Sequence, residues 1–275
     1  MLNIGCHLSI SKGLVAMAHN AIAIHANTMQ FFAGNPRGSS SGPKSGIDEF
    51  KNILKSYNFA PFIVHAPYIV NLCSNNEYVR SNSEKVIKQE IEWLNQIPGN
   101  YYNIHPGCHV GSGIKRGIEL ISESLAKIIP ACNNSTLLLE TMSGKGSEVG
   151  SKFEEIAEII ANLNHSDNVG VCLDTCHIFS AGYDIIHNLN KVLEDFDKII
   201  GIKRLKAIHL NDSMTPFASK KDRHELIGHG TIGLPAILNI TKHPMLNHLP
   251  FVLETPNDIS GYEQEIKILK SQTLS

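Results

Sequence analysis

The sequence predicts an α/β fold, a (β/α)8 TIM barrel in which residues 1–275 form a single domain. Eight short apolar segments alternate with eight segments of helical spacing, and successive apolar segments end roughly 30–45 residues apart, as in such a barrel. Most of them end in His, Asp or Glu, and all strands of a barrel point their C-terminal ends at one face. The alternative is an open doubly wound sheet, but no glycine-rich phosphate loop follows the first apolar segment.

The predicted strands are short runs rich in apolar and β-branched residues. The sixth, Val169 to Asp174, has two valines among apolar neighbours and ends abruptly in a carboxylate. This pattern is typical of a parallel strand that is buried on both faces. The eight strands are expected at residues 3–7, 28–33, 61–65, 101–105, 136–140, 169–174, 205–209 and 251–254.

The predicted helices are amphipathic segments between these strands. Residues 83–96 give the clearest pattern, with Val86 and Leu94 on the apolar face and Ser83 as the expected N-cap. Residues 34–46 are rich in Gly, Ser and Pro and are expected to form a loop. The eight helices are expected at residues 12–25, 48–57, 83–96, 114–129, 152–163, 190–200, 234–241 and 259–270.

The composition is that of an ordinary soluble globular protein, with 42% hydrophobic and 18% charged residues. The net charge of −2 gives no bulk attraction for nucleic acid, but several divalent cations in one cleft would create a local positive field. No apolar run is long enough to span a membrane, and the N-terminus lacks the pattern of a secretory signal. Six irregularly spaced cysteines are typical of reduced thiols, so we expect a cytoplasmic protein.

The strand ends carry an unusual set of ionisable residues. A single histidine at a strand end is more often a hydrogen-bonded core residue than a metal ligand, and a single glutamate is more often paired with Lys or Arg. In a barrel, however, all of these side chains would converge on one face, where few Lys or Arg compete. The first predicted strand also ends in a histidine, His7. The six residues expected to bind metal at strand ends are His65, His105, Glu140, Asp174, His209 and Glu254.

Three further candidates lie on predicted loops. His177 follows Asp174 closely, and Asp222 and His224 would face the same way in an extended segment. Nine candidates are too many for one four-coordinate ion and suit two or three, with a carboxylate bridging a pair. His and carboxylate ligands favour zinc, with manganese as the alternative at the carboxylate-rich site.

Seven motifs, in this order, resemble the endonuclease IV family of apurinic/apyrimidinic endonucleases. They are VHAPY, NIHPG, LLLETM, GVCLDTCHIFSAGYD, IHLNDS, DRHELIGHGTIG and VLETP, and the resemblance extends over nearly the whole chain. It implies a TIM barrel with three zinc ions that cuts damaged double-stranded DNA on the 5′ side of an abasic site, leaving a 3′-hydroxyl and a 5′-deoxyribose phosphate. It also implies a monomer with no obligatory protein partner, and leaves a 3′-repair diesterase activity open.

The resemblance also implies roles for individual residues. His65 and His105 would hold one zinc ion, and Glu140 would bridge it to a second and act in catalysis. The second ion would be completed by Asp174, His209 and Glu254, and the third would be held by His177, Asp222 and His224.

Two loops are expected to contact DNA on the same grounds. One contains Asn35 and Arg37, and the other contains Tyr68 and Ile69. Tyr68 and Ile69 are apolar residues just beyond a candidate ligand and are suited to wedge into a base stack. The alternative for this pair is packing against a neighbouring loop.

A sugar isomerase or epimerase on the same barrel, of the xylose isomerase kind, is the competing hypothesis. Glu140, Asp174, His209 and Glu254 alone resemble its metal site. The remaining five candidate ligands have no use in isomerisation at one metal. A catalytically silent DNA-binding protein would require absent ligands, and none of the nine is absent.

Overall fold

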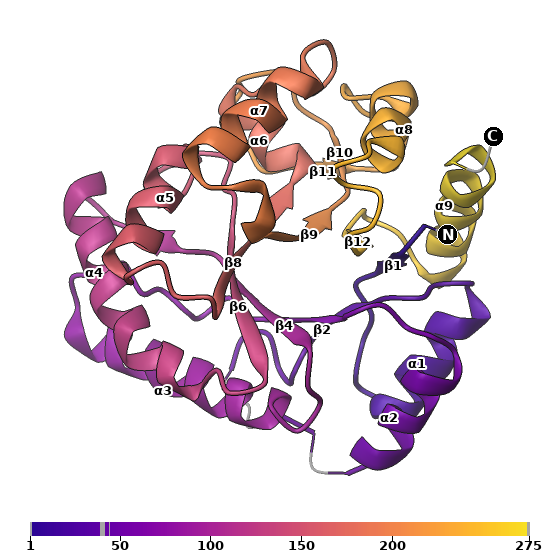
Figure 1. Ribbon diagram of the computed structural model, residues 1–275, viewed down its shortest axis with the longest axis horizontal. Helices are drawn as coiled ribbons and strands as arrows, with labels where there is room; N and C mark the ends of the chain where they lie inside the picture. Colours follow the sequence, from indigo (N-terminus) through magenta and orange to yellow (C-terminus); the bar gives the residue numbers. More distant parts are fainter. Residues whose placement is uncertain (1, 39–41, 44, 274–275) are drawn as a thin grey trace.

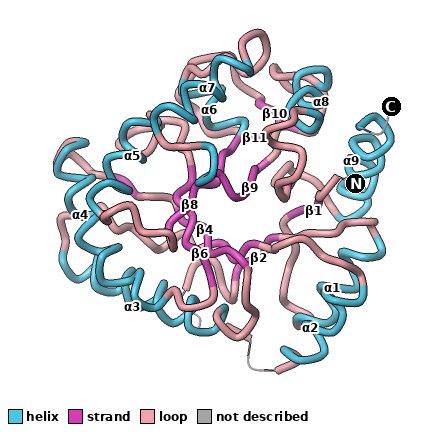
Figure 2. Tube along the Cα trace, in the orientation of Figure 1, coloured by secondary structure: helices cyan, strands magenta, loops and turns pink. Residues whose placement is uncertain are grey.

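Eight parallel strands form the centre of the molecule, with the helices around them (Figures 1 and 2). This computed structural model describes residues 2–38, 42–43 and 45–273, so residues 39–41 and 44 of the predicted 34–46 loop lie outside the described part. The order of neighbouring strands around the sheet is β1-β12-β9-β8-β6-β4-β3-β2. Their bounds are β1 Ile4–Cys6, β2 Gln30–Phe32, β3 Ile63–His65, β4 Asn100–Ile104, β6 Ser135–Glu140, β8 Val169–Asp174, β9 Leu205–His209 and β12 Phe251–Leu253.

The connections between these strands are mostly helical, as predicted. The α-helices are α1 Leu14–Ala23, α2 Ile47–Ser56, α3 Glu77–Leu94, α4 Ile114–Ile128, α5 Phe153–Asn162, α6 Thr175–Ala181, α7 Leu189–Ile199, α8 Leu234–Lys242 and α9 Ile259–Thr273. Short 3-10 turns lie at Ile129–Ala131 and Ile202–Arg204. Two short antiparallel pairs lie outside the main sheet: β5 Gly107–Cys108 with β7 Glu148–Val149, and β10 Asp212–Ser213 with β11 His224–Glu225.

The sheet closes between its first and last strands. His7, just after β1, forms a parallel bridge with Gln30 of β2, and the Leu8 backbone N–H donates to the Gln30 carbonyl oxygen over 2.7 Å. The prediction of a single-domain (β/α)8 barrel is therefore confirmed. Because the barrel is closed, side chains at successive positions of a strand point alternately outward to the helices and inward to the axis.

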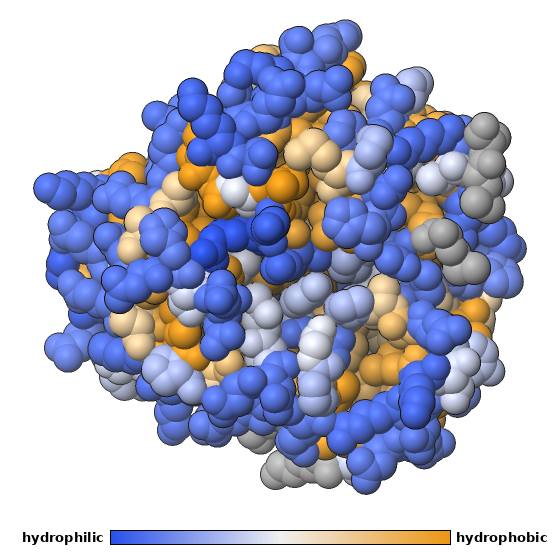
Figure 3. All heavy atoms as spheres, in the orientation of Figure 1, coloured by the Kyte–Doolittle hydropathy of each residue, from blue (hydrophilic) through white to orange (hydrophobic). Residues whose placement is uncertain are grey.

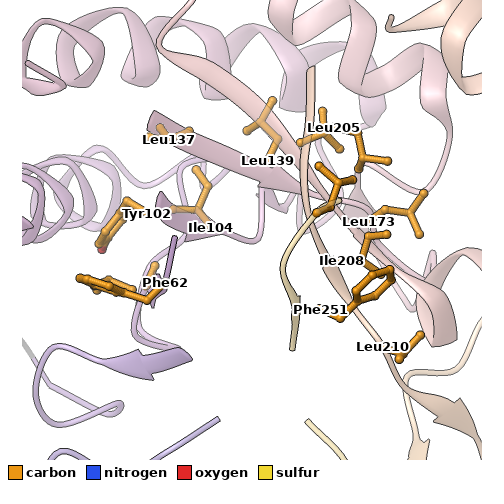
Figure 4. Close-up of a cluster of buried hydrophobic side chains, with 14 of the residues drawn as sticks. Phe62, Tyr102, Ile104, Leu137, Leu139, Leu173, Leu205, Ile208, Leu210 and Phe251 are labelled. Carbon is orange, nitrogen blue, oxygen red and sulfur yellow. The ribbon is translucent and has the colours of Figure 1, made fainter. Parts of the chain in front are cut away.

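The outward faces of the strands bind the helices through a continuous apolar core. Tyr102, Leu137, Leu139 and Phe251 are fully buried members of this core (Figure 4). Burying side chains of this size contributes about 1.5–3 kcal/mol each. This layer of packing fixes the position and tilt of each strand, and so fixes where each strand ends.

The inward faces form a smaller apolar cluster that fills the barrel. Its fully buried members are Ile63, Leu138, Cys172, Ala207 and Val252, one from each of five strands. Two residues further along each strand, on the same inward face, stand His65, Glu140, Asp174, His209 and Glu254 respectively. The twofold repeat of the strand therefore places these candidate ligands as one layer above an apolar plug.

The predicted start of the third helix is wrong. Helix α3 begins at Glu77, six residues before the expected start, because the Asn76 side chain accepts a hydrogen bond from the Tyr78 backbone N–H and acts as the N-cap. Ser83 lies within the helix, where its hydroxyl donates to the Val79 carbonyl oxygen. The segment expected to be extended around His224 contains β11, which pairs with β10.

The face of the molecule shown in Figure 3 is largely hydrophilic, with hydrophobic side chains visible between the polar ones. Among the described residues, no helix is both long enough and apolar enough to cross a membrane.

A buried carboxylate on α3 makes the stability of the barrel depend on pH. Glu90 is 1% exposed and accepts a 2.8 Å hydrogen bond from the Tyr102 hydroxyl. Burial raises the pKa of Glu90 to about 7, although this hydrogen bond acts to lower it. The folded state therefore holds a proton that the unfolded state releases near pH 4.5, and stability falls as pH rises between these values.

We predict that Glu90→Gln stabilises the protein above pH 7, by at most about 3 kcal/mol, and has little effect near pH 4. Urea unfolding at pH 4 and pH 8 measures the difference. Glu92→Gln, an exposed position on the same helix, is the matched control and should change little at either pH. An equal effect of Glu90→Gln at both pH values would contradict the assignment.

Candidate metal centre

A hollow of about 270 Å³ opens above the inward ligand layer. Its walls combine seven of the nine predicted metal ligands with an aromatic side. The residues that line it are His7, Phe32, His65, Tyr68, His105, Glu140, His177, Asp222, His224, Glu254 and Tyr262.

The other two candidates, Asp174 and His209, are fully buried just behind these walls. His209 contacts Glu140 and Glu254, and Asp174 contacts His224. The structure thus brings all nine sequence-predicted ligands together.

Glu140, at the end of β6, is the centre of the cluster and is 1% exposed. One carboxylate oxygen, Oε2, lies 3.3 Å from His65 Nε2 and 3.4 Å from His105 Nε2. The other, Oε1, lies 3.3 Å from His209 Nδ1. A carboxylate with histidine nitrogens on both sides has the arrangement of a bridge between two ions.

His177 lies on a helix and not on a loop, which corrects the prediction. The Asp174 side chain caps α6 by accepting from the His177 backbone N–H over 2.8 Å, and Gly182 ends the helix in a left-handed conformation. One turn of helix therefore carries His177 back over the end of β8. Its Nε2 atom lies 3.3 Å from Asp222 Oδ1.

The loop after β9 brings in the last two candidates. His224 pairs with Ser213 in the β10–β11 ladder, and its Nε2 atom lies 3.5 Å from Asp222 Oδ1 and 3.6 Å from Asp174 Oδ2. Asp174 thus contacts both this group and the group around His209, a shared role that the strand-end pattern did not reveal.

A buried carboxylate, Asp212, organises this loop from beneath. It is fully buried and accepts hydrogen bonds from five backbone N–H groups, of which Gly228 and Gly230 lie at 3.0 and 3.1 Å. Gly228 has φ +81°, and a Cβ at Gly230 would lie 2.4 Å from Asp212 Oδ1. The backbone around the Asp212 carboxylate therefore requires glycine at Gly228, for its positive φ, and at Gly230, for lack of space.

The hydrogen bonds of the histidines fix which ring nitrogen faces the hollow. His65 Nδ1 and His177 Nδ1 each lie 2.8 Å from a backbone carbonyl oxygen, and His224 Nδ1 lies 3.2 Å from another. His209 uses Nε2 instead, 2.7 Å from the Gln30 side-chain oxygen. Oxygens of this kind only accept, so each of these nitrogens carries a proton and the opposite nitrogen faces the carboxylates. This is the usual arrangement around metal-binding histidines.

The unpaired polar atoms of this cluster indicate that it is suited to bind cations. Within the described part of the chain, four buried atoms of the candidate ligands have no hydrogen-bond partner: Glu140 Oε1, His177 Nε2, His209 Nδ1 and His224 Nε2. The ion-pair partners of the four carboxylates there are all histidines. Leaving such atoms buried and unpaired costs several kcal/mol, and a divalent ion between them removes that cost.

Eight of the candidate ligands form three groups, and within each group the ligand atoms lie within 4.8 Å of one another. They are His65, His105 and Glu140; Glu140, Asp174, His209 and Glu254; and Asp174, His177 and His224.

The carboxylates of Glu140 and Glu254 are ionised at neutral pH. Burial acts to raise the pKa of Glu140, but His209 and His105 hold it well below its usual range. Burial likewise opposes ionisation of Glu254, whose pKa is nevertheless lowered to about 2, chiefly by His209. Against the effect of burial, nearby acidic groups raise the pKa of His177 and His209 well above the ordinary value. Metal binding would therefore displace protons from these rings.

Three amide side chains orient the candidate ligands, and sequence reasoning missed them. Asn103 Nδ2 donates to Glu140 Oε2 over 2.5 Å, and Gln30 Nε2 donates to Glu254 Oε1 over 2.5 Å. Asn211 Nδ2 donates to Asp174 Oδ2 over 2.8 Å. Asn103 could have been found, because it occupies the inward position on β4 that a ligand holds on the neighbouring strands.

The residues expected to contact DNA lie on loops at the edge of the hollow. Asn35 and Arg37 are exposed, and the Asn35 side chain accepts from the Arg37 backbone N–H. Tyr68 is 68% exposed and Ile69 is 37% exposed. The Tyr68 backbone N–H donates to the carbonyl oxygen of Pro36 over 2.9 Å, so the two loops are held together.

The chain matches known proteins over nearly all of its length. A family model described as a xylose isomerase-like TIM barrel matches residues 19–272. A protein from Clostridium beijerinckii named probable endonuclease 4 is 53% identical over 273 residues, covering 98% of this chain and 99% of that protein. The chain belongs to the endonuclease IV family. A protein of the same name from Akkermansia muciniphila is 51% identical, covering 97% of both chains.

Solved structures agree with this membership. The crystal structure of endonuclease IV from Thermus thermophilus is similar with a TM-score of 0.85 and 29% identity, covering 98% of each chain. The structure of a D-tagatose 3-epimerase-like protein is similar with a TM-score of 0.75 and 22% identity, covering 98% of this chain and 97% of that one. The second likeness shows only that the barrel is shared.

We predict that Asp212→Asn loosens the 213–233 segment of this endonuclease IV family member. Replacing one acceptor oxygen by an N–H₂ group leaves buried backbone donors unpaired, which should lower the free energy of unfolding by about 2–4 kcal/mol. Hydrogen exchange at Gly228, Gly230 and Ile232 should become faster than in the rest of the barrel. Asp167→Asn, at an exposed loop position, is the matched control. Unchanged exchange at these amides would show that Asp212 does not organise the segment.

Proposed function

We propose that this chain is a zinc-dependent repair endonuclease that hydrolyses the phosphodiester on the 5′ side of an abasic site in double-stranded DNA. The products would be a 3′-hydroxyl and a 5′-deoxyribose phosphate. The observation that carries the proposal is the convergence of nine His, Asp and Glu side chains around one hollow, eight of them in three groups that share Glu140 and Asp174. Membership of the endonuclease IV family supports it.

The three groups would hold three zinc ions, with Glu140 bridging two of them. His and carboxylate donors suit zinc, and the group with three carboxylates, Glu140, Asp174 and Glu254, is where manganese would compete. Asp222 would be a further ligand of the ion held by His177 and His224, since its Oδ1 atom lies 3.3 and 3.5 Å from their Nε2 atoms. Such ions, when bound, activate water and offset negative charge around a phosphate.

The chain's own residues would hold this site rigid. Asn103 fixes one oxygen of Glu140, and Thr141 accepts from His177 Nδ1 through its carbonyl oxygen. Asn103 and Thr141 are buried, so the Glu140 oxygen and the His177 ring that they hold cannot turn toward solvent. Catalysis on a phosphodiester depends mainly on such fixed placement of charge.

The loop with Asn35 and Arg37 and the hydrogen-bonded loop beside it, with Tyr68 and Ile69, would contact the DNA. Tyr68 and Ile69 would insert beside the baseless position, where least stacking is lost, and Arg37 would contact phosphate. Asn35 would hold the backbone turn that presents Arg37. Extrusion of the baseless sugar would bring its 5′ phosphate to the hollow.

A one-metal sugar isomerase is the competing function. The group of Glu140, Asp174, His209 and Glu254 would suffice for it. The family model's description as xylose isomerase-like is consistent with it. The other candidate ligands also line this hollow, and the Nε2 atoms of His177 and His224 have no hydrogen-bond partner there, which favours the nuclease. We further expect the enzyme to act in the cytoplasm, as a monomer without an obligatory partner.

We predict that Glu140→Gln lowers incision of a duplex with one abasic site by about a thousandfold or more, because an amide cannot bridge two cations. The measurement is cleavage of a labelled oligonucleotide, with circular dichroism to show that the fold persists. Glu90→Gln, a buried glutamate on α3 outside the hollow, is the matched control and should retain activity. Incision by Glu140→Gln within about tenfold of the parent would reject the proposed role.

A further inference from the structure

His7 lines the hollow but belongs to none of the three ligand groups. It follows β1 and its side chain is 22% exposed. Its ring packs against Phe32, with centroids 4.6 Å apart, and Phe32 in turn contacts Tyr68 at 5.2 Å. His7 therefore stands on the aromatic side of the hollow, next to the candidate ligand Glu254.

The Gln30 side chain determines which ring nitrogen of His7 carries the proton. Its Nε2 atom lies 2.5 Å from Glu254 Oε1, and a carboxylate only accepts, so the amide nitrogen must face Glu254. The amide oxygen then faces His209 Nε2 at 2.7 Å. The remaining N–H of Gln30 points to His7 Nδ1 at 3.1 Å.

Since Gln30 donates to it, His7 Nδ1 carries a lone pair. The neutral ring must then carry its proton on Nε2. Within the described part of the chain, no hydrogen bond reaches this Nε2 atom. The 2.9 Å bond from the His7 N–H to the Leu253 carbonyl oxygen involves the main chain alone. His7 thus offers a neutral N–H donor beside the hollow.

The surroundings of this donor indicate what it would meet. The groups on the other sides of the hollow are the carboxylates and imidazoles proposed to hold cations, which suit the charged phosphate. Phe32 and Tyr68 beside His7 suit the carbon atoms of a sugar, and a neutral N–H suits a neutral oxygen. A baseless deoxyribose has two such oxygens near its first carbon, the ring oxygen and the C1′ hydroxyl.

We propose that His7 Nε2–H donates a hydrogen bond to the C1′ hydroxyl of the baseless sugar and so helps this enzyme to distinguish an abasic site from an intact nucleotide. This inference rests on the proposed function. In an intact nucleotide the base replaces the C1′ hydroxyl, so that acceptor is lost and the base must fit against the Phe32 side of the hollow.

The test compares two variants of the metal-loaded enzyme on two substrates. His7→Phe keeps a ring against Phe32 and removes the donor, while His7→Gln restores an N–H donor. We expect kcat/KM on a natural abasic site to fall at least about tenfold in His7→Phe and to recover to within about threefold in His7→Gln. His248→Phe, at an exposed position before β12, is the control and should match the parent.

The second substrate carries tetrahydrofuran, which has the ring oxygen but no C1′ hydroxyl. A loss in His7→Phe on the natural site alone supports the contact with the hydroxyl. An equal loss on both substrates overturns it, because the ring oxygen is also present in an intact nucleotide. Activity of His7→Phe within about twofold of the parent on both substrates overturns the inference. So does a drop in bound metal that accounts for the loss, because His7 would then act through the ligands.

A readout independent of activity is the ¹⁵N NMR spectrum of the parent at pH 7, with the His7 signals identified by their absence in His7→Phe. A proton on Nε2 and none on Nδ1 is expected, and the reverse overturns the inference. If the parent itself fails to cut abasic DNA, the proposed function has failed. If the parent cuts and His7→Phe cuts equally well, only the inference about His7 has failed.

Discussion

The structure depends on the concentration of negative charge at one end of the barrel. Glu140, Asp174, Asp222 and Glu254 lie close together around a small hollow, and within the described residues only histidines form ion pairs with them. Buried carboxylates at this density repel one another and lose their hydration, so they need cations nearby. Protons on the histidines or divalent ions between the side chains can meet this requirement, and the choice between them links the fold to its function.

The barrel meets this requirement through the repeat of its strands. An apolar layer that includes Leu138 and Val252 fills the interior, and the ligand layer begins two residues later on the same faces. The amide side chains of Gln30 and Asn103 then fix Glu254, His209 and Glu140 by short hydrogen bonds. Because Gln30 and Asn103 lie within strands β2 and β4, the packing of the barrel holds these two supports in place.

The sequence was sufficient to predict the architecture and six of the nine candidate ligands, since strand ends in a closed barrel must converge and the ionisable side chains mark those ends. The other three, His177, Asp222 and His224, lie outside the barrel strands and followed from their spacing and from the family resemblance. The sequence was less informative where a local hydrogen bond decides the outcome. Asn76 and Ser83 both suit an N-cap, and only the chain's path before α3 selects Asn76. Amides such as Gln30 carry no distinctive sequence pattern, because their role depends on neighbours from distant strands.

The central claim is that this hollow holds several divalent ions that hydrolyse DNA at abasic sites. Metal analysis and incision of an abasic duplex, measured on one sample before chelation, after chelation and after zinc is restored, test it most directly. The account predicts about three zinc ions per chain, loss of incision on chelation and its return with zinc. About one ion per chain, or incision that persists after the metal is removed, would contradict it.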